Sequence, residues 1–377
     1  MENKKLKVGN VPPLRFPGFE GEWKSKKLGE IATFSKGKGI SKSDIEENGL
    51  TECIRYGELY TYYGEVINDI KSKTNVDTSN LVLSEVNDVI IPASGETTID
   101  IATASCVLKS GIALGGDLNI IKTENNGVFL SYYLNNKKKM EIANLAQGIS
   151  VVHLYSSQLA TLTLNFPKLE EQNRISTFLA LFDARIQTQN KIIEQLETLI
   201  KGLCQKLILS QSPNIKLKDC VSCYSSALTE STVMNENGIY PVYGANGIIS
   251  FIDNYQIDSD SILIIKDGAG VGKVQFARGK LSIIGTLNYF IAKSGTNLKY
   301  IFYSLKFFTF EKYKVGSGIP HIYFKDYGES LFFCPSFDEQ RNIEQLLSSI
   351  DEKINIQKIL LQKYELQKKH LLQNLFI

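Results

Sequence analysis

The chain has 377 residues, of which 43% are hydrophobic and 22% charged, a balance that excludes a disordered tail or a fibre and leaves room for two folded domains. Forty-two Lys and Arg against 40 Asp and Glu give a formal net charge of +2, which excludes a protein that binds nucleic acid through overall charge alone. No stretch approaches the roughly 18 apolar residues of a membrane span, and the N-terminus lacks the apolar core of a signal peptide, so we expect a cytoplasmic protein that does not contact a membrane.

An N-terminal segment, residues 1–22, precedes a first predicted domain of residues 23–167. This domain is rich in Tyr, Phe, Ile and Val with interspersed Gly and Asn, as in VNDVIIPASGETTIDIA, which is typical of short strands joined by turns. The segment FLSYYLNNKKKM predicts a short helix, and a loop with His153 follows it. The expected fold class of this domain is α+β, with a mostly β domain as the alternative.

A long helix is predicted for residues 168–212, because its apolar residues step alternately by four and three positions, as the a and d positions of a coiled coil do. The seam positions are Ile175, Leu179, Phe182, Ile186, Gln189, Ile193, Leu196, Ile200, Leu203 and Leu207. Gln189 is the polar residue among them.

A second domain, residues 213–335, and a second long helix, residues 336–377, repeat this order. The stretch from His153 to Leu207 returns from His321 to Leu375 at a constant offset of 168 residues. The second seam comprises Ile343, Leu347, Ile350, Ile354, Gln357, Leu361, Tyr364, Lys368, Leu371 and Leu375. Two copies of one module predict two similar sites on one chain.

Gln189 and Gln357 occupy the same seam position near the middle of each helix. In an antiparallel pair of helices the two glutamines meet. This pairing also places the two domains at opposite ends and creates a pseudo-two-fold axis. A buried polar seam residue fixes register at a cost in stability. Two alternatives stay open: a parallel pair also aligns the glutamines, and both could face solvent on helices that are not fully paired.

The segment LRFPGFEGEW, both loop-His-strand-Pro-Glu-Gln junctions and the terminal coil resemble the DNA-specificity subunit of type I restriction-modification systems. The resemblance implies two target-recognition domains that each read one half of a split, asymmetric double-stranded DNA site, with the helices as the spacer that sets the gap. It also implies a chain without catalytic activity that binds no cofactor or metal itself. Its implied partners are two modification subunits, which bind S-adenosylmethionine and methylate adenine, and restriction subunits, which use ATP and Mg.

Candidate DNA contacts lie in glycine-rich loops with cations and beside them, because backbone amides, Lys and Arg can approach phosphates and base edges there. They are Lys36, Lys38, Arg55, Tyr56, Ser94, Gly95, Thr97, Lys266, Lys273 and Arg278. The first-domain loop at Ser94 lacks the charge of the Lys266 loop and must use hydroxyl and backbone groups. The alternative function is a two-headed protein-binding scaffold without DNA specificity.

Other motifs are interpreted as structural. His153 and His321 have no nucleophile or carboxylate duplicated beside them, so we expect a structural hydrogen bond at each junction of domain and helix. The loop from Gly268 to Lys273 lacks the spacing and the hydroxyl of a phosphate-binding Walker loop. Cys220 and Cys223 form an isolated pair and predict no zinc site. The basic tail Lys368–Lys369–His370 is expected to be free to dock the modification subunits.

Overall fold

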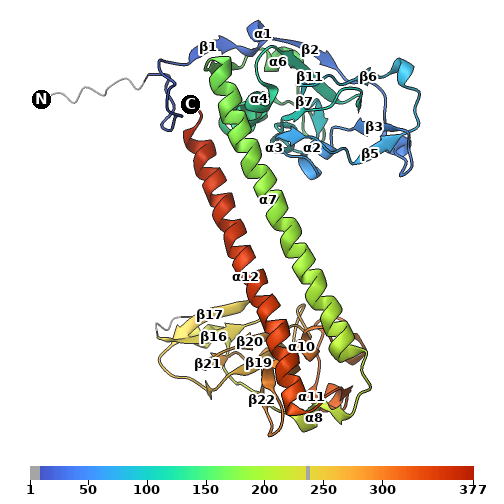
Figure 1. Cartoon of the computed structure of the whole chain (residues 1–377), viewed down its shortest axis with the longest axis vertical. Helices are drawn as coiled ribbons and strands as arrows, with labels where there is room; N and C mark the ends of the chain where they lie inside the picture. The colour runs from blue at the N-terminus through green and yellow to red at the C-terminus, as the bar shows by residue number, and fades with distance from the viewer. Residues whose placement is uncertain (1–8, 235–237) are drawn as a thin grey trace, which may run out of the picture. The chain divides into compact units, whose positions relative to one another are not determined.

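The computed structural model describes residues 9–234 and 238–377, which form two compact units (Figure 1). The first unit runs to Thr188 and also takes Leu361–Ile377, whereas the second comprises Gln189–Leu360. This division falls inside the two long helices, and the predicted domain limits, 23–167 and 213–335, stay predictions. None of the described helices has the length and apolar character needed to cross a membrane.

The first unit combines strands and helices. Its strands are β1 (Lys24–Lys27), β2 (Ala32–Lys36), β3 (Thr51–Ile54), β4 (Val66–Ile67), β5 (Ser72–Thr74), β6 (Val82–Leu83), β7 (Val89–Pro92), β8 (Ser94–Gly95), β9 (Ser105–Val107), β10 (Ala113–Leu114), β11 (Leu118–Thr123), β12 (Val152–His153) and β13 (Thr163–Phe166). Its helices are α1 (Leu28–Ile31), α2 (Glu58–Thr61), α3 (Thr98–Ile101), α4 (Gly127–Tyr133), a π-helical turn (Leu134–Lys138), α5 (Lys139–Leu145), α6 (Ser156–Leu159) and the start of α7 (Leu169–Cys204). The larger sheets have the strand orders β2-β11-β7-β9-β4 and β5-β3-β10-β6.

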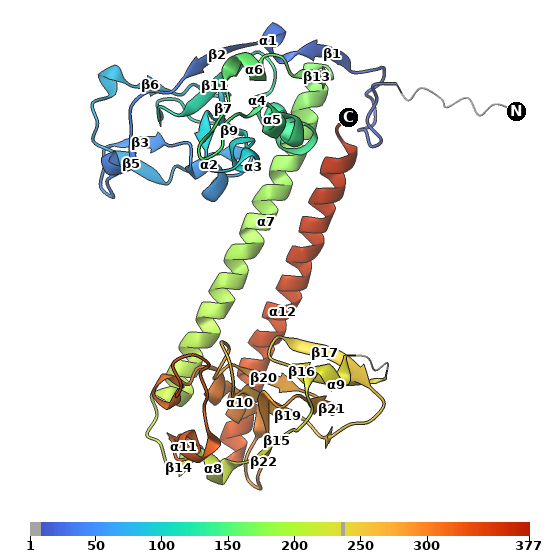
Figure 2. The same cartoon turned by 180° about the vertical axis from the view of Figure 1, so that it is seen from behind.

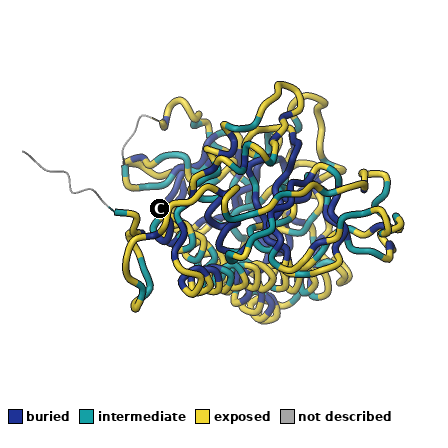
Figure 3. The backbone as a smooth tube through the Cα atoms, turned by 90° about the horizontal axis from the view of Figure 1, so that it is seen from above, coloured by how far each residue is buried: buried dark blue, intermediate teal, exposed yellow. Residues whose placement is uncertain are grey.

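Strand β7 lies inside the five-stranded sheet and is buried on both faces, which explains its continuous apolar sequence. Val89 and Ile91 join the core that contains Phe129 of α4 and Leu179 of α7. Ile90 points to the other side and packs in a separate core with strands of the second sheet. Figure 3 shows the backbone from above with its buried stretches in dark blue. The five-stranded sheet, the four-stranded sheet and the helices thus form the α+β arrangement that the sequence predicts.

The second unit has the same kind of composition. Its strands are β14 (Ile215–Lys216), β15 (Val221–Ser225), β16 (Tyr240–Gly244), β17 (Gly247–Ile252), β18 (Ile257–Asp258), β19 (Ser261–Ile265), β20 (Val274–Ala277), β21 (Lys280–Ile283), β22 (Leu287–Ala292) and β23 (Leu331–Phe332). Its helices are α8 (Leu217–Cys220), α9 (Glu230–Val233), α10 (Leu298–Lys306), α11 (Phe324–Tyr327) and most of α12 (Phe337–Asn374). The sheets have the orders β15-β22-β19-β20 and β17-β16-β21-β18.

Strand β19 of the second unit resembles β7 of the first, because every residue of both strands is buried. Ile262 and Ile264 pack in a core with Leu347 of α12, whereas Leu263 packs on the opposite side with Ile283 of the other sheet. A central apolar strand between a second sheet and the helices therefore occurs in both units, as the matching sequence layout predicts.

The two long helices run antiparallel within each unit (Figures 1 and 2). In the first unit Leu375, near the end of α12, shares a core with Leu179, near the start of α7. In the second unit Leu347, near the start of α12, shares a core with Ile200, near the end of α7. The predicted coiled-coil seam and its antiparallel sense are confirmed, and the parallel alternative is excluded. The pseudo-two-fold relation of the two units stays a prediction.

The predicted seam glutamines lie opposite each other in the second unit. The Gln189 side chain is only 6% exposed, and its Nε2 donates a hydrogen bond to Oε1 of Gln357. The alternative in which both glutamines face solvent is therefore wrong. Their role in fixing the register of the helices stays a prediction.

A second repeated glutamine joins each long helix to its domain. Gln172 is 2% exposed; its Oε1 accepts the backbone N–H of Asn126 at 3.0 Å, and its Nε2 donates to the carbonyl of Pro167 at 3.0 Å. Gln340 is 1% exposed and makes the same two bonds, to the N–H of Asn297 at 2.8 Å and to the proline before α12 at 2.9 Å. The Glu-Gln motif of the repeat is thus a buried connection between long helix and short helix.

Replacing Gln172 with leucine is expected to lower the free energy of unfolding of the first unit by about 2–3 kcal/mol, because a partly buried N–H and a buried carbonyl lose their partners. Urea denaturation followed by the fluorescence of Trp23, the single Trp of the chain, reports on this unit. The exposed Gln187→Leu on the same helix is the control. Equal midpoints for the two variants would contradict this role of Gln172.

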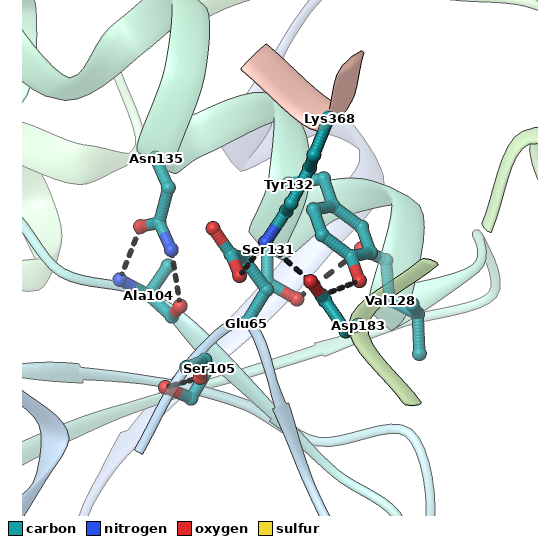
Figure 4. A network of polar contacts seen from close by, with 10 residues as sticks. Glu65, Ala104, Ser105, Val128, Ser131, Tyr132, Asn135, Asp183 and Lys368 are labelled. Atoms are coloured by element: carbon teal, nitrogen blue, oxygen red, sulfur yellow. Dashed lines mark hydrogen bonds and ion pairs between the residues drawn. The ribbon is translucent and has the colours of Figure 1, made fainter. Parts of the chain in front are cut away.

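A polar network near the end of α12 is also part of the first unit (Figure 4). The Tyr132 hydroxyl donates to Asp183 of α7, and Lys368 of α12 pairs with Asp183 at 2.6 Å and with Glu65 at 3.3 Å. Burial, together with the nearby Asp183 carboxylate, raises the pKa of Tyr132, so this hydroxyl remains a donor. The expectation that Lys368 is free to dock a partner is wrong, because both carboxylates already hold its ammonium group.

The second unit repeats the tyrosine and the carboxylate but takes its cation from elsewhere. The Tyr303 hydroxyl donates to Asp351 at 3.1 Å, and Lys306 of α10 pairs with Asp351 at 3.0 Å. Asp351 follows Asp183 by the repeat offset of 168. A tyrosine on the short helix therefore orients the same long-helix carboxylate in both units, whereas the lysine that neutralises it differs.

Candidate nucleic-acid interface

Two of the predicted contacts, Lys36 at the end of β2 and Lys38 in the loop that follows, have exposed side chains. The Lys38 N–H donates to the carbonyl of Leu114 at 2.9 Å. A Cβ added to Gly37 would lie 2.0 Å from the Gly115 carbonyl oxygen, so only glycine fits at this approach. The glycine lets the loop lie tightly against the turn before β11 while the lysines on either side project into solvent.

Arg55 and Tyr56 lie at the entrance to α2 and are both half-buried. Arg55 Nη2 is 3.0 Å from Oε1 of Glu58, a residue that is 2% exposed and also accepts the hydroxyl of Ser72 at 2.6 Å. The guanidinium group is therefore positioned by a buried carboxylate, a partner that the sequence pattern did not reveal. Such a fixed guanidinium group has a defined direction, which suits bidentate contacts.

The first-domain loop at Ser94 is less accessible than its sequence indicates. Ser94 and Gly95 form β8, which pairs with β12, and both are buried. Thr97 is exposed, and its Oγ1 accepts the N–H of Asp100 at 3.1 Å, which caps α3. Solvent therefore reaches this loop from Glu96 onward. DNA contacts by Ser94, Gly95 and Thr97 stay predictions.

The glycine loop of the second unit occupies the equivalent place. Ile322 donates its N–H to the Lys266 carbonyl at 2.9 Å, as Leu154 donates to the Ala93 carbonyl at 3.0 Å in the first unit. Lys266 thus stands where the first unit has Ala93, and it is half-buried, whereas Lys273 at the end of the loop is exposed. The same scaffold position carries a cation in one domain and a methyl group in the other.

Arg278 is not brought together with this loop. Strands β19 and β20 pair with Ile264 opposite Val274 and Ser261 opposite Ala277, so Lys273 and Arg278 flank opposite ends of β20. Five residues of extended strand span about 16 Å, so Lys273 and Arg278 lie about that far apart. Arg278 and the glycine loop would therefore touch different parts of a bound duplex.

The two histidines hold the ends of the loops together through their backbones. His153 exchanges both backbone hydrogen bonds with Gln147, and His321 does so with Val315, again at the repeat offset. His321 Nδ1 also lies 2.7 Å from Oδ1 of Asp267, but the first unit has a serine at that place. The two histidines thus share a backbone bridge within their loops, and the predicted hydrogen bond at the junction of domain and helix stays a prediction.

Tyr155 and Tyr323, two residues after the histidines, are 47% and 49% exposed and lie outside the pattern of glycines and cations that predicts the other contacts. The repeat could have revealed them, because they too are 168 residues apart. Cys220 and Cys223 are free thiols. Within residues 9–234 and 238–377, no group of three or more His, Cys, Asp or Glu is placed to hold a metal ion.

Comparison with known proteins identifies the module that is repeated. The type I restriction modification DNA specificity domain matches residues 20–198 and again residues 214–366. The chain belongs to the type I specificity subunit family. Each match of the specificity domain includes one globular region and most of the long helix that follows it, so the module is the domain together with its helix.

Relatives cover nearly the whole specificity subunit. The type I restriction enzyme MjaVIII specificity subunit of Methanocaldococcus jannaschii is 24% identical over 400 residues, which is 93% of this chain and 91% of that protein. The crystal structure of the type I S subunit from M. genitalium covers 97% of this chain and 99% of its own, with a TM-score of 0.73 at 19% identity. A chain from a structural study of complex assembly and conformational transition in the type I system covers 97% of this chain, with a TM-score of 0.54 at 16% identity. The two structural matches support the fold, and family membership favours DNA over a protein scaffold.

Proposed function

We propose that the chain is the non-catalytic subunit that reads a split, asymmetric double-stranded DNA sequence, with one half read by each domain and the gap set by the paired helices. The observation that carries this proposal is a repeated scaffold with different residues at equivalent loop positions. Ala93-Ser94-Gly95 and Lys266-Asp267-Gly268 are held by the same backbone bonds to the histidine loops. A protein that recognises two different half-sites needs the same backbone scaffold in both domains and different side chains on it.

The predicted contacts then divide by chemistry. Exposed Lys36, Lys38 and Lys273 suit phosphates or guanine, and the oriented Arg55 suits a bidentate contact with guanine in the major groove. Thr97 supplies a hydroxyl oxygen in the loop where the first domain lacks a cation, although its hydrogen is donated to Asp100 Oδ2 at 2.6 Å. None of these groups supplies the paired acid and base that a reaction would require.

The proposed partners are two modification subunits, which hold S-adenosylmethionine and methylate adenine, and restriction subunits, which hold ATP and Mg. A net charge of +2 fits such an assembly, because partners that enclose the duplex can neutralise most phosphates. Exposed apolar residues on the outward face of α12, such as Ile356 at 54% and Ile359 at 53%, offer a surface for the modification subunits. Action on chromosomal DNA places the proposed complex in the cytoplasm.

The test is genome-wide sequencing of adenine methylation in a host that carries this chain with its modification subunit, compared with the same host lacking only this chain. We expect a split motif with a fixed central gap only when the chain is present. Exchange of residues 23–167 for another recognition domain should change one half of the motif alone. Identical methylation in both hosts, although the two subunits co-purify, would overturn the proposal and favour a protein scaffold.

A further inference from the structure

The histidine loops of the two units carry the same three-residue pattern, His-x-Tyr. The middle residue, Leu154 or Ile322, is 0% or 1% exposed and bonds to the end of the central strand. Side chains on extended backbone alternate between the two sides. The tyrosine therefore points outward on the same side as the histidine, next to the loop that differs between the domains.

A lysine lies beside each of these tyrosines. Lys36 Nζ is 5.9 Å from the ring centroid of Tyr155, and Lys325 Nζ is 5.5 Å from that of Tyr323. The two lysines come from unrelated parts of the chain, one from the end of β2 and the other from α11. The same combination of exposed phenol and ammonium group thus arises twice by different routes, which simple duplication does not explain.

An element that is the same in both domains cannot distinguish two different half-sites. If the domains read different sequences, the feature of DNA common to both is the sugar-phosphate backbone. A phenolic hydroxyl donates to a phosphate oxygen, and an ammonium group at the ring neutralises its charge and releases a counterion. The chemistry of the pair fits a phosphate group.

We propose that Tyr155 with Lys36 and Tyr323 with Lys325 form two equivalent phosphate-binding positions, one for each half-site, that set the distance of the variable loops from the duplex. This inference rests on the proposed function, since it assumes that both domains contact DNA. The inference adds Tyr155, Tyr323 and Lys325 to the proposed DNA contacts and gives them a role other than reading bases. The loops then supply sequence preference, and the His-x-Tyr elements supply affinity that is independent of sequence.

A matched control exists in the second unit. Lys280 Nζ lies 4.5 Å from the ring of Tyr255, but Asp258 is also 3.9 Å from that ammonium group. The carboxylate opposes an approaching phosphate. Tyr255 has no place in the His-x-Tyr repeat, so Tyr255→Phe should leave DNA binding unchanged.

The experiment uses the complex of the full chain with its modification subunits and two duplexes, one with the methylation motif and one of scrambled sequence. Tyr155→Phe and Tyr323→Phe should each weaken binding by about fivefold to tenfold on both duplexes, with the two losses multiplying in the double variant. Lys36→Gln and Lys325→Gln should each reduce the slope of log affinity against log salt by about 0.9. Thermal melting checks that every variant remains folded.

The outcomes separate the inference from the function on which it rests. A loss on the motif duplex alone, or a changed ratio between the duplexes, would mean that the tyrosines read bases and would overturn the phosphate role. Unchanged affinity in the double variant would overturn it as well, while the proposed function would stand. A wild-type complex that binds neither duplex would refute both.

Discussion

Replacing Phe376 with alanine is expected to lower the free energy of unfolding of the first unit by about 3–5 kcal/mol, because a fully buried aromatic side chain is lost. Phe376 is 0% exposed, and its ring centroid lies 5.2 Å from that of Phe129 and 5.6 Å from that of Tyr133. Phe376 and Phe129 are nearly 250 positions apart in the sequence. The penultimate residue of the chain is therefore part of the core of the first domain.

Urea denaturation followed by Trp23 fluorescence measures this effect, because the Trp23 ring is 5.8 Å from Phe129 in the same core. Leu366→Ala is the control, since this leucine lies on α12, ten residues before Phe376, and is 67% exposed. A midpoint for Phe376→Ala that matches the control would show that the segment after α12 does not stabilise the first domain. The expected result also means that truncation of α12 would damage the first domain itself.

Replacing Lys368 with methionine is expected to destabilise the first unit by about 2–3 kcal/mol, because the carboxylates of Asp183 and Glu65 would remain largely buried without their cation. The side chains of Lys368, Asp183 and Glu65 are 19%, 22% and 19% exposed, so water screens them only in part. The exposed neighbour Lys369→Met should change stability little. Equal denaturation midpoints for the two methionine variants would contradict the network in Figure 4.

The same lysine predicts how stability depends on pH. Burial lowers the pKa of Lys368, but the Glu65 and Asp183 carboxylates outweigh burial, and the pKa is raised above its ordinary 10.5. A raised pKa in the folded state contributes stability below about pH 10.5, which is lost as the pH rises through the folded value. The wild-type chain should therefore lose more stability above that pH than Lys368→Met, and parallel curves would exclude this contribution.

Much of the architecture follows from periodicities that are local in the sequence. The alternating steps of four and three predict the seam, and the constant offset predicts that Gln189 and Gln357 meet. The antiparallel direction of the helices became clear only from the cores of the units, because a parallel pair would align the same glutamines. The sequence predicts Lys368 as a seam position and as a free tail residue, since the pattern cannot reveal that Asp183 and Glu65 surround it.

The candidate site was less predictable, because exposure and partnership depend on distant segments. Glycine and cation content predicts which loops carry the candidate contacts, and those contacts stay predictions. The sequence does not show that Ser94 is buried or that Arg278 lies beyond the far end of β20. Nor does it show Lys36 beside Tyr155, more than 100 positions away.

The sequence by itself determined the duplication, the two α+β domains and the helical seam, because the hydrophobic period and the repeat spacing can be read directly from the order of the residues. Only the tertiary structure decided which charges are paired inside a unit, which loop residues reach solvent, and that Phe376 completes the first core. Those properties arise from contacts between segments that chain folding brings together, and such contacts leave no periodic trace in the sequence.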